Sequence, residues 1–309
     1  MTQVETVDSG LHIADLNFQS LPGVIASFIL SEGGELGLVE TGPTSTLPAL
    51  VAALEPFGGV ERLSAVVVTH IHLDHSGGVG QLLRLAPHAR CYVHTNGARH
   101  LIDPSKLLRS AVRIFGDQMD SLWGEVVPAA ENQIVPVEDG DTIRIGGHDL
   151  QVVYTPGHAS HHIALHDSSR KAVFVGDVAG VRLPGSNHVR PPTPPPDIDP
   201  ALCHESVARL RVLDVDTLLL THYGSHSGDV GRHLDQLLER LDRWVEMIRQ
   251  AEQDSLDRDQ MIELLRAESD GHVLGGGGNA EMVTRYALAT PYPMSVDGLI
   301  YLLSKEAVA

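Results

Sequence analysis

The sequence is poor in cysteine, in basic residues and in long apolar runs. Its two cysteines, Cys91 and Cys203, allow one disulfide at most, and two thiols in a cytoplasmic chain are expected to be free and partly buried. No apolar run approaches the length that crosses a bilayer, so no membrane partner is predicted. The start, Met1 to Glu5, lacks the basic and apolar segments of a secretory signal, which predicts a cytoplasmic location.

Basic residues are outnumbered, with 22 Lys and Arg against 40 Asp and Glu and a formal net charge of −18. A nucleic-acid enzyme needs a basic surface to release counterions from phosphates, and no run of Lys and Arg supplies one. We therefore predict a small-molecule substrate and no nucleic-acid partner. The commonest reason for such acidity is solubility.

What the chain does contain is an alternation of short, strand-like apolar runs with helical patterns, which predicts a layered α/β architecture. Strands are predicted at Val24–Leu30, Leu36–Glu40, Ala65–Thr69, Arg90–His94, Leu150–Thr155, Ala172–Gly176 and Thr217–Thr221. Helices are predicted at Leu47–Leu54, Val79–Leu85 and Asp199–Leu213. In the last of these, Pro200 fits a first helical turn behind an aspartate cap.

From Asp229 the composition changes, and apolar residues recur at the spacing of an amphipathic helix: Leu234, Leu237, Leu238, Leu241, Val245 and Ile248. Residues 229–309 are predicted to form a helical C-terminal extension, with a flexible loop at Gly275–Gly278. This extension is expected to pack on a catalytic domain of residues 1–228, and its leucine stripe to face that domain rather than a second copy. If the chain forms a homo-oligomer, a homodimer is expected, because dimers are the commonest homo-oligomers.

Two segments, Asn96–Val127 and Val181–Asp197, are predicted to be loops that set the size of a pocket. The second contains Pro191–Pro196, which is a stiff extended segment. It is either a spacer before the next helix or, if Asp177 ends a strand, a wall of the pocket. The sequence favours neither alternative.

The central feature is the run of residues 69–78, THIHLDHSGG, directly after a predicted strand. In an extended chain, residues i and i+2 point to the same side, so His70 and His72 can bind one ion. The chain must then turn, and the two glycines permit a tight entry into a helix. That turn aims Asp74 and His75 at a neighbouring position. Four potential ligands within six residues indicate a metal site.

Three further predicted strands are each followed by a side chain that can bind a metal: His158, Asp177 and His222. In α/β proteins, sites form just beyond the carboxyl ends of strands. Each of these residues by itself has an ordinary explanation as a turn or loop residue. Their joint occurrence in this order favours a common site.

One ordered set of residues resembles the complete ligand pattern of the metallo-β-lactamase superfamily: His70, His72, Asp74, His75, His158, Asp177 and His222. The match runs from about Val24 to Gly224. The Thr-Pro-Gly-His and Gly-Asp segments resemble the hydrolase branch that contains glyoxalase II and lactonases. The resemblance implies an αββα four-layer sandwich, with two sheets between outer helices and the metals at one sheet edge.

The resemblance also implies how the ligands divide. The first ion is bound by His70, His72 and His158. The second is bound by Asp74, His75 and His222, and Asp177 bridges both. Imidazole and carboxylate ligands without cysteine suit zinc, iron or manganese, so two divalent ions are implied, with zinc foremost. One departure is Glu40, which stands where the family has an aspartate; it is not an expected ligand, but its contacts are expected to shift.

Two cations that share a water lower its pKa and supply hydroxide near neutral pH. The predicted reaction is therefore hydrolysis of a small ester, thioester or lactone by a metal-bridging hydroxide. Asp74 is expected to steer that hydroxide and accept its proton, in addition to binding the second ion. Tyr223 could donate a hydrogen bond to an oxyanion, although packing explains one tyrosine as well. His161 and His162 either face the pocket or have surface or strand-capping roles.

Two other activities fit the same residues. A phosphotriester hydrolase would use the same hydroxide. Persulfide dioxygenases resemble this fold but keep one iron, bound by the equivalents of His70, His158 and Asp177. The complete second site favours two metals, and seven intact ligand positions disfavour a binding scaffold without turnover.

Overall fold

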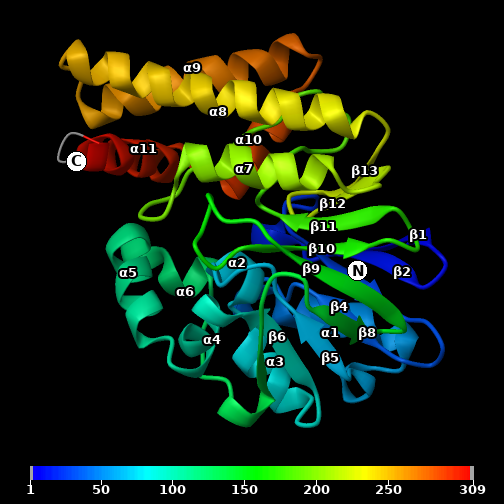
Figure 1. The fold of residues 1–309 in the computed structure, drawn as a ribbon. Helices are drawn as coiled ribbons and strands as arrows, with labels where there is room; N and C mark the ends of the chain where they lie inside the picture. Colours follow the sequence, from blue (N-terminus) through cyan, green and yellow to red (C-terminus); the bar gives the residue numbers. More distant parts are fainter. Residues whose placement is uncertain (1–2, 307–309) are drawn as a thin grey trace.

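The computed structural model describes residues 3–306 and contains two β-sheets packed face to face, with helices over their outer faces (Figure 1). The first sheet has the order β1-β2-β3-β4-β5-β6-β7. Its strands are β1 (Val4–Asp8), β2 (Leu11–Asp15), β3 (Ala26–Leu30), β4 (Gly37–Val39), β5 (Ala65–Val67), β6 (Arg90–His94) and β7 (Ile134–Val137). The second sheet has the order β13-β12-β11-β10-β9-β8. Its strands are β8 (Thr142–Ile145), β9 (His148–Tyr154), β10 (Ile163–Asp167), β11 (Ala172–Gly176), β12 (Thr217–Leu220) and β13 (Gly224–Ser227).

The helices fall into three groups along the chain. Those that connect strands of the first sheet are α1 (Leu47–Leu54), α2 (Leu73–Ser76), α3 (Val79–Leu85), α4 (Thr95–Ile102), α5 (Ser105–Phe115) and α6 (Met119–Leu122). One helix, α7 (Pro200–Arg211), connects β11 to β12. The C-terminal helices are α8 (Val230–Gln253), α9 (Arg258–Gly275), α10 (Ala280–Ala289) and α11 (Tyr292–Glu306).

Strand direction brings the ends of the site-bearing strands together. In the second sheet, β9 and β11 are each antiparallel to β10, and β11 is parallel to β12. The carboxyl ends of β9, β11 and β12 therefore lie at one edge. In the first sheet, β4, β5, β6 and β7 are parallel to one another, so their carboxyl ends also share an edge.

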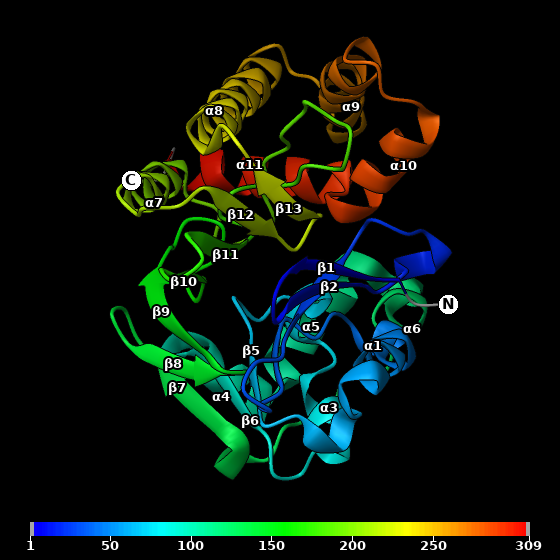
Figure 2. The ribbon, with the colours of Figure 1, turned by 90° about the vertical axis from the view of Figure 1, so that its right-hand side faces the viewer.

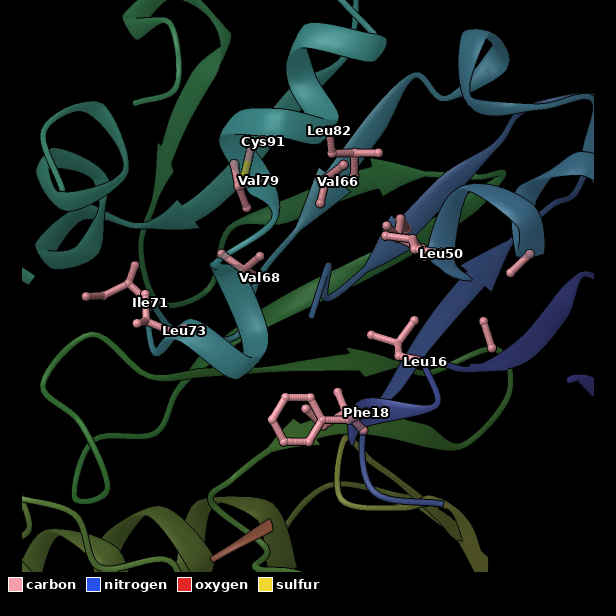
Figure 3. Packing of buried hydrophobic residues seen from close by; sticks show 14 of the residues in the cluster. Leu16, Phe18, Leu50, Val66, Val68, Ile71, Leu73, Val79, Leu82 and Cys91 are labelled. Atoms are coloured by element: carbon pink, nitrogen blue, oxygen red, sulfur yellow. The ribbon is translucent and has the colours of Figure 1, made fainter. Parts of the chain in front are cut away.

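Strand β5 shows why the central strands are continuous apolar runs rather than alternating ones. Ala65 and Val67 face the second sheet, in a cluster that also contains Phe28 and Phe174, whose rings lie edge to face 5.2 Å apart. Val66 faces the opposite way and packs in a second cluster with Leu50 of α1 and Leu82 of α3 (Figure 3). Since both faces are buried, both need apolar side chains.

The C-terminal helices gather at one side of the molecule, next to β11, β12 and β13 (Figures 1 and 2). Leu234 and Leu237 of α8 pack against the second sheet with Val173 and Leu218. Further along α8, Trp244 and other apolar residues pack with α9 and α11 instead. The stripe therefore faces the sandwich in its first part, whereas its later part, Leu241 to Ile248, packs mainly with the other C-terminal helices. Among the described residues, no helix is long and apolar enough to cross a membrane.

The predicted αββα sandwich with C-terminal helices is confirmed. Asp199 caps α7 through a hydrogen bond from the Leu202 amide, as its place before Pro200 predicted. The prediction of a loop at Asn96–Val127 is wrong, because this segment contains most of α4 and all of α5 and α6. Its helices were missed because their apolar residues are interrupted by exposed cations and remain partly exposed themselves.

Candidate metal centre

Five histidines and two aspartates converge at the shared edge of the two sheets. Two come from the loop after β5, two from the short helix α2, and three from just beyond β9, β11 and β12. These residues are, in chain order, His70, His72, Asp74, His75, His158, Asp177 and His222. They form three overlapping groups in which the ligand atoms lie within 4.8 Å of one another.

The first group consists of three imidazoles. His72 Nδ1 lies 2.9 Å from His70 Nε2 and 2.9 Å from His158 Nε2. All three rings are buried or nearly so, because they come from strand ends that the two sheets enclose. Three nitrogens that converge on one point can serve as ligands of a single ion.

The second group combines two imidazoles with a carboxylate. Asp74 Oδ2 lies 3.3 Å from His222 Nε2 and 3.7 Å from His75 Nε2. Asp74 comes from the first turn of α2, and its side chain is 21% exposed, whereas His75 and His222 are buried. This group therefore opens to solvent on the side of the aspartate.

Asp177 lies between the two groups, with one carboxylate oxygen toward each. Its Oδ2 is 3.2 Å from His158 Nε2, on the side of the first group. Its Oδ1 is 3.4 Å from His75 Nε2 and 3.6 Å from His222 Nε2, on the side of the second. This arrangement is suited to a carboxylate that contacts two ions.

Three buried atoms at this centre have no hydrogen-bond partner among the described residues: His75 Nε2, Asp177 Oδ1 and His222 Nε2. Leaving buried polar atoms unpaired is costly, so each such atom requires an explanation. All three point toward one another and are of the types that bind divalent metals. The residues therefore fit a pair of metal ions, and the clusters are consistent with a dinuclear site.

The second ring nitrogen of four of these histidines is held by a neighbour, which fixes the nitrogen that faces the centre. His222 Nδ1 lies 2.8 Å from the carbonyl oxygen of Val24, and His158 Nδ1 lies 3.1 Å from that of Pro192. His75 Nδ1 bonds Glu40, and His70 Nδ1 bonds Thr69. A carbonyl or carboxylate oxygen only accepts, so Nδ1 of His75, His158 and His222 donates, and Nε2 is the nitrogen that faces the centre.

Glu40 supports the site rather than entering it. Its Oε1 accepts hydrogen bonds from the Thr69 hydroxyl and from His75 Nδ1, and a longer one of 3.4 Å from the Thr221 hydroxyl. The side chain is fully buried, and its φ of 66° is uncommon for a residue other than glycine. Backbone strain of this kind persists where the surroundings hold it in place. Glu40, whose side chain is one methylene longer than that of aspartate, therefore bonds His75 while its own backbone is strained.

Two histidines left open by the sequence have different places. His162 is buried; its Nε2 accepts from the Asp177 amide at 3.1 Å, and its Nδ1 lies 2.8 Å from the Thr155 hydroxyl. His162 therefore helps to position Asp177 through its backbone amide. His161 lines the cavity described below, and burial lowers its pKa to about 3. The only sequence signal for these two places was the pair of adjacent histidines that follows His158.

Tyr223 is half-buried and packs against two sets of apolar residues, one between the two sheets and one on the outer face of the first sheet. Burial and the nearby Asp15 raise the pKa of its hydroxyl. Of the described residues, those that line the cavity beside the metal centre do not include Tyr223. Its role as an oxyanion donor stays a prediction.

The electrostatics of the two groups differ. Burial lowers the pKa of His70 and His158, and the neighbouring imidazoles lower that of His70 further. Burial also acts to lower the pKa of His75, but the charges of Asp177, Asp74 and Glu40 outweigh it and raise that pKa well above its ordinary value. The second group thus has a strongly negative potential, which favours a cation.

A cavity of about 560 Å³ opens beside the centre. His72, Asp74, His158 and Asp177 line its inner end, and α4, α5 and α11 contribute to its sides. The proline segment 192–196 forms part of the wall, so the second alternative for this segment holds. Because the carbonyl oxygen of Pro192 also accepts the hydrogen bond of His158, the segment both borders the cavity and orients a candidate metal ligand.

A sandwich of two sheets with this His and Asp set at one edge defines a class of metal-binding proteins. The sequence profile of the Metallo-beta-lactamase superfamily matches residues 21–222, which is more than half of the chain. The chain therefore belongs to the metallo-beta-lactamase superfamily.

Among similar proteins, a metallo-beta-lactamase fold-containing protein of Sulfurisphaera tokodaii is 26% identical over 235 residues, or 75% of this chain and 85% of that protein. A hydroxyacylglutathione hydrolase of Aeromonas salmonicida is 32% identical over 158 residues, or 51% of this chain and 46% of that enzyme. An acyl-coenzyme A thioesterase of Homo sapiens is 33% identical over 117 residues, or 36% of this chain and 40% of that enzyme. The matches to these two enzymes thus span less than half of their length.

Solved structures extend the similarity of the fold. A metallo-beta-lactamase family protein from Thermus thermophilus has a TM-score of 0.68 at 20% identity and covers 98% of this chain and 95% of its own. The archaeal superfamily protein from Sulfolobus tokodaii has a TM-score of 0.60 at 24% identity, covering 75% and 86%. The first of these matches includes the C-terminal helices as well as the sandwich.

Proposed function

We propose that this chain is a binuclear metal-dependent hydrolase that cleaves a small ester, thioester or lactone. The observation that carries the proposal is the position of Asp177, with one oxygen toward each group of ligands. A site for one ion would not need the complete second group of Asp74, His75 and His222. The unpaired buried nitrogens of His75 and His222 support the occupation of this second position.

When bound, two such ions lower the pKa of a shared water and polarise the oxygen of the substrate. The chain's own residues supply the geometry for that chemistry. Asp74 lines the cavity and is partly open to it, so its carboxylate can accept a hydrogen bond, and then a proton, from the attacking water. The buried side chains of His158 and His222 are held by hydrogen bonds to carbonyl oxygens, and Asp177 is held by the bond from its amide to His162.

Two observations favour acyl chemistry, and a thioester in particular. Similar proteins are named as a hydroxyacylglutathione hydrolase and an acyl-coenzyme A thioesterase. The cavity is lined by many apolar side chains, including Phe115, Trp123 and Met294, and its volume suits a small acyl group. With a net charge of −18, the chain is poorly suited to a polynucleotide.

The first experiment measures metal per chain in protein purified without chelators or an affinity metal, followed by a panel of thioesters, lactones, esters and phosphotriesters. We expect about two ions per chain and acyl hydrolysis that a chelator abolishes and added metal restores. A single iron per chain, with oxygen consumed on addition of a persulfide, would replace the proposal by the dioxygenase. Phosphotriester turnover far above that of every acyl substrate would replace it by the phosphotriester hydrolase.

A further inference from the structure

Helices α4 and α5 carry a concentration of positive charge that runs against the composition of the chain. Residues 95–115 contain four basic residues and one acidic residue, whereas the whole chain has 22 basic and 40 acidic residues. The four cations are Arg99, Lys106, Arg109 and Arg113. All four are exposed, and none forms an ion pair with any residue between 3 and 306.

Three of these cations form one stripe along α5. Lys106, Arg109 and Arg113 are separated by three and four residues, which places them on one face of the helix. Like charges at this spacing destabilise a helix by about 0.2–0.5 kcal/mol for each pair. The nearest acid, Asp103, accepts a hydrogen bond from the Ser105 amide and pairs with none of them. Hydrogen bonds from Ser105 lower the pKa of Asp103 and the charge of Arg109 contributes to lowering it, but no ion pair in the described part of the chain neutralises the stripe.

The stripe borders the cavity of the metal centre. Lys106 lines that cavity, as does Arg99 from α4. The adjoining face of α5 contributes apolar residues to the same cavity, among them Ile114, which is 43% exposed. A ligand that enters the cavity therefore meets an apolar surface with cations along one margin.

We propose that α4 and α5 recognise a thioester whose thiol carrier is polyanionic, with phosphate groups along the cation stripe and an apolar acyl group in the cavity. This inference rests on the proposed hydrolase function. Lys106 and Arg113 are seven residues apart, or about 10 Å along the helix, so a ligand that meets the whole stripe has its negative charges spread over a similar length. A single carboxylate is too short for that, whereas a nucleotide-type carrier with several phosphates has the required extent.

The reaction balances with water as the only co-reactant. The oxygen of water bonds to the thioester carbonyl carbon, and the carbon–sulfur bond breaks. The products are a carboxylate and a free thiol, one proton of the water passing to the thiolate sulfur and the other to solvent. The cation stripe takes no part in these steps; it binds the part of the substrate that leaves.

A basic amphipathic helix is also a feature of proteins that bind membrane surfaces. Two observations favour a small ligand here. The apolar residues Leu107, Ala111 and Phe115 of α5 face the cavity rather than solvent. The net charge of −18 opposes an anionic bilayer, which meets a whole face of the molecule, more than it opposes a small ligand that meets only the stripe.

The first test measures binding without turnover. Desulfo-coenzyme A, which has the phosphates but no thiol to bind a metal, is titrated into the full metal-loaded chain at low ionic strength by calorimetry. The test variant carries Lys106→Gln, Arg109→Gln and Arg113→Gln, and the control carries Arg84→Gln, Arg90→Gln and Arg232→Gln. The control residues are exposed cations elsewhere, so the change in net charge is the same. We expect the test variant alone to bind at least tenfold more weakly, with a reduced dependence on salt.

The second test compares two thioesters of one acyl group, octanoyl-coenzyme A and octanoyl-N-acetylcysteamine, which differ only in the carrier. We expect the test variant to lose about tenfold or more in kcat/KM for the first and to keep its value for the second. Equal kcat/KM for both thioesters in the unaltered protein would overturn the inference while leaving the hydrolase intact. Failure to hydrolyse either thioester, with desulfo-coenzyme A still bound through the stripe, would overturn the proposed function instead. Binding to anionic vesicles that requires the stripe, without binding of desulfo-coenzyme A, would assign the helix to a membrane surface and overturn the inference.

Discussion

The floor and the walls of the cavity are built in different ways. The floor consists of ligands at the ends of β5, β9, β11 and β12 and in α2, and most have a second polar atom fixed by a buried neighbour. The walls consist of α4, α5, parts of α10 and α11 and the proline segment, with exposed and unpaired side chains such as Lys106. Atoms that must hold a geometry are fixed by the two sheets, while side chains that meet a substrate remain adjustable. Substitutions in the floor should therefore change kcat, and substitutions in the walls should change KM and substrate choice.

One buried residue connects the two parts. Arg190 is fully buried, lies over the rings of Tyr286 and Tyr292, and donates hydrogen bonds to Ser269 and to the Tyr292 hydroxyl. It thereby fixes the segment that leads to Pro192, whose carbonyl oxygen bonds His158. The C-terminal helices thus reach the metal centre through the backbone of the wall.

Helix α11 packs closely on the same segment. The Thr193 hydroxyl donates to the carbonyl of Ser295, and a Cβ on Gly298 would lie 2.0 Å from the carbonyl oxygen of Thr193. Only glycine permits this approach. The wall is therefore held on both sides of Pro192.

The largest effect is expected for Asp177→Asn, which removes charge between the two ligand groups. We expect metal content to fall below two ions per chain and kcat/KM to fall by about 10³-fold or more, because both positions lose an anionic ligand. Elemental analysis and kinetics on the same preparation measure both quantities. The control is Asp197→Asn, in a cavity-lining carboxylate that bonds Ser160 outside the ligand groups. Two ions per chain in Asp177→Asn would contradict the bridging position.

A smaller loss is expected for Asp74→Asn measured with saturating metal. The amide keeps the size of the carboxylate but cannot accept a proton, so kcat should fall by about 10²–10³-fold with KM little changed. The pH profile of kcat should change as well. Turnover near that of the unaltered protein would eliminate the proton-accepting role.

Glu40→Gln tests the support of the floor from outside the ligand set. His75 loses a charged acceptor, and removal of such an outer partner costs about 10–100-fold in metal affinity. Competition with a chromophoric chelator should show one ion weakened more than the other, because Glu40 bonds His75 directly and reaches His70 only through Thr69. Glu35→Gln, in an exposed carboxylate of the connection between β3 and β4, is the matched control and should leave both affinities unchanged. Equal weakening of both ions would contradict the separation of the two groups.

The smallest effect on chemistry is expected for Arg190→Met, in the link between wall and floor. A buried network that loses one charged partner is destabilised by about 3–5 kcal/mol, so chemical denaturation should show a clear loss of stability. At a temperature where the variant is folded, we expect the ion bound by the group of His158 to be weakened more than the other. Arg144→Met, whose side chain is 59% exposed, should change stability by less than about 0.5 kcal/mol. Unchanged stability of Arg190→Met would show that the wall is held by other contacts.

Much of the floor could be predicted from the sequence, because its signals are local. The run of residues 69–78, and the residues His158, Asp177 and His222, each follow an apolar run directly. Strand ends in such a fold lie at one edge, so the pattern predicted the ligand set and its common location. The walls gave weaker signals. Helices α4 to α6 were missed because exposed cations interrupt their apolar residues, of which some pack on the core and others line the cavity, so their periodicity is irregular.

By itself, the sequence determined which side chains are available for metals, their order along the chain and the class of the fold. The tertiary structure alone decided what stands behind them. It placed the carbonyl of Val24 against His222, 198 residues away, and Glu40 against His75. It also placed a stripe of cations beside the cavity. Such contacts join segments whose separation along the chain carries no periodic signal, and they form only when two sheets close on each other. For that reason, residue patterns predict candidate ligands, whereas only the folded chain shows how they are oriented.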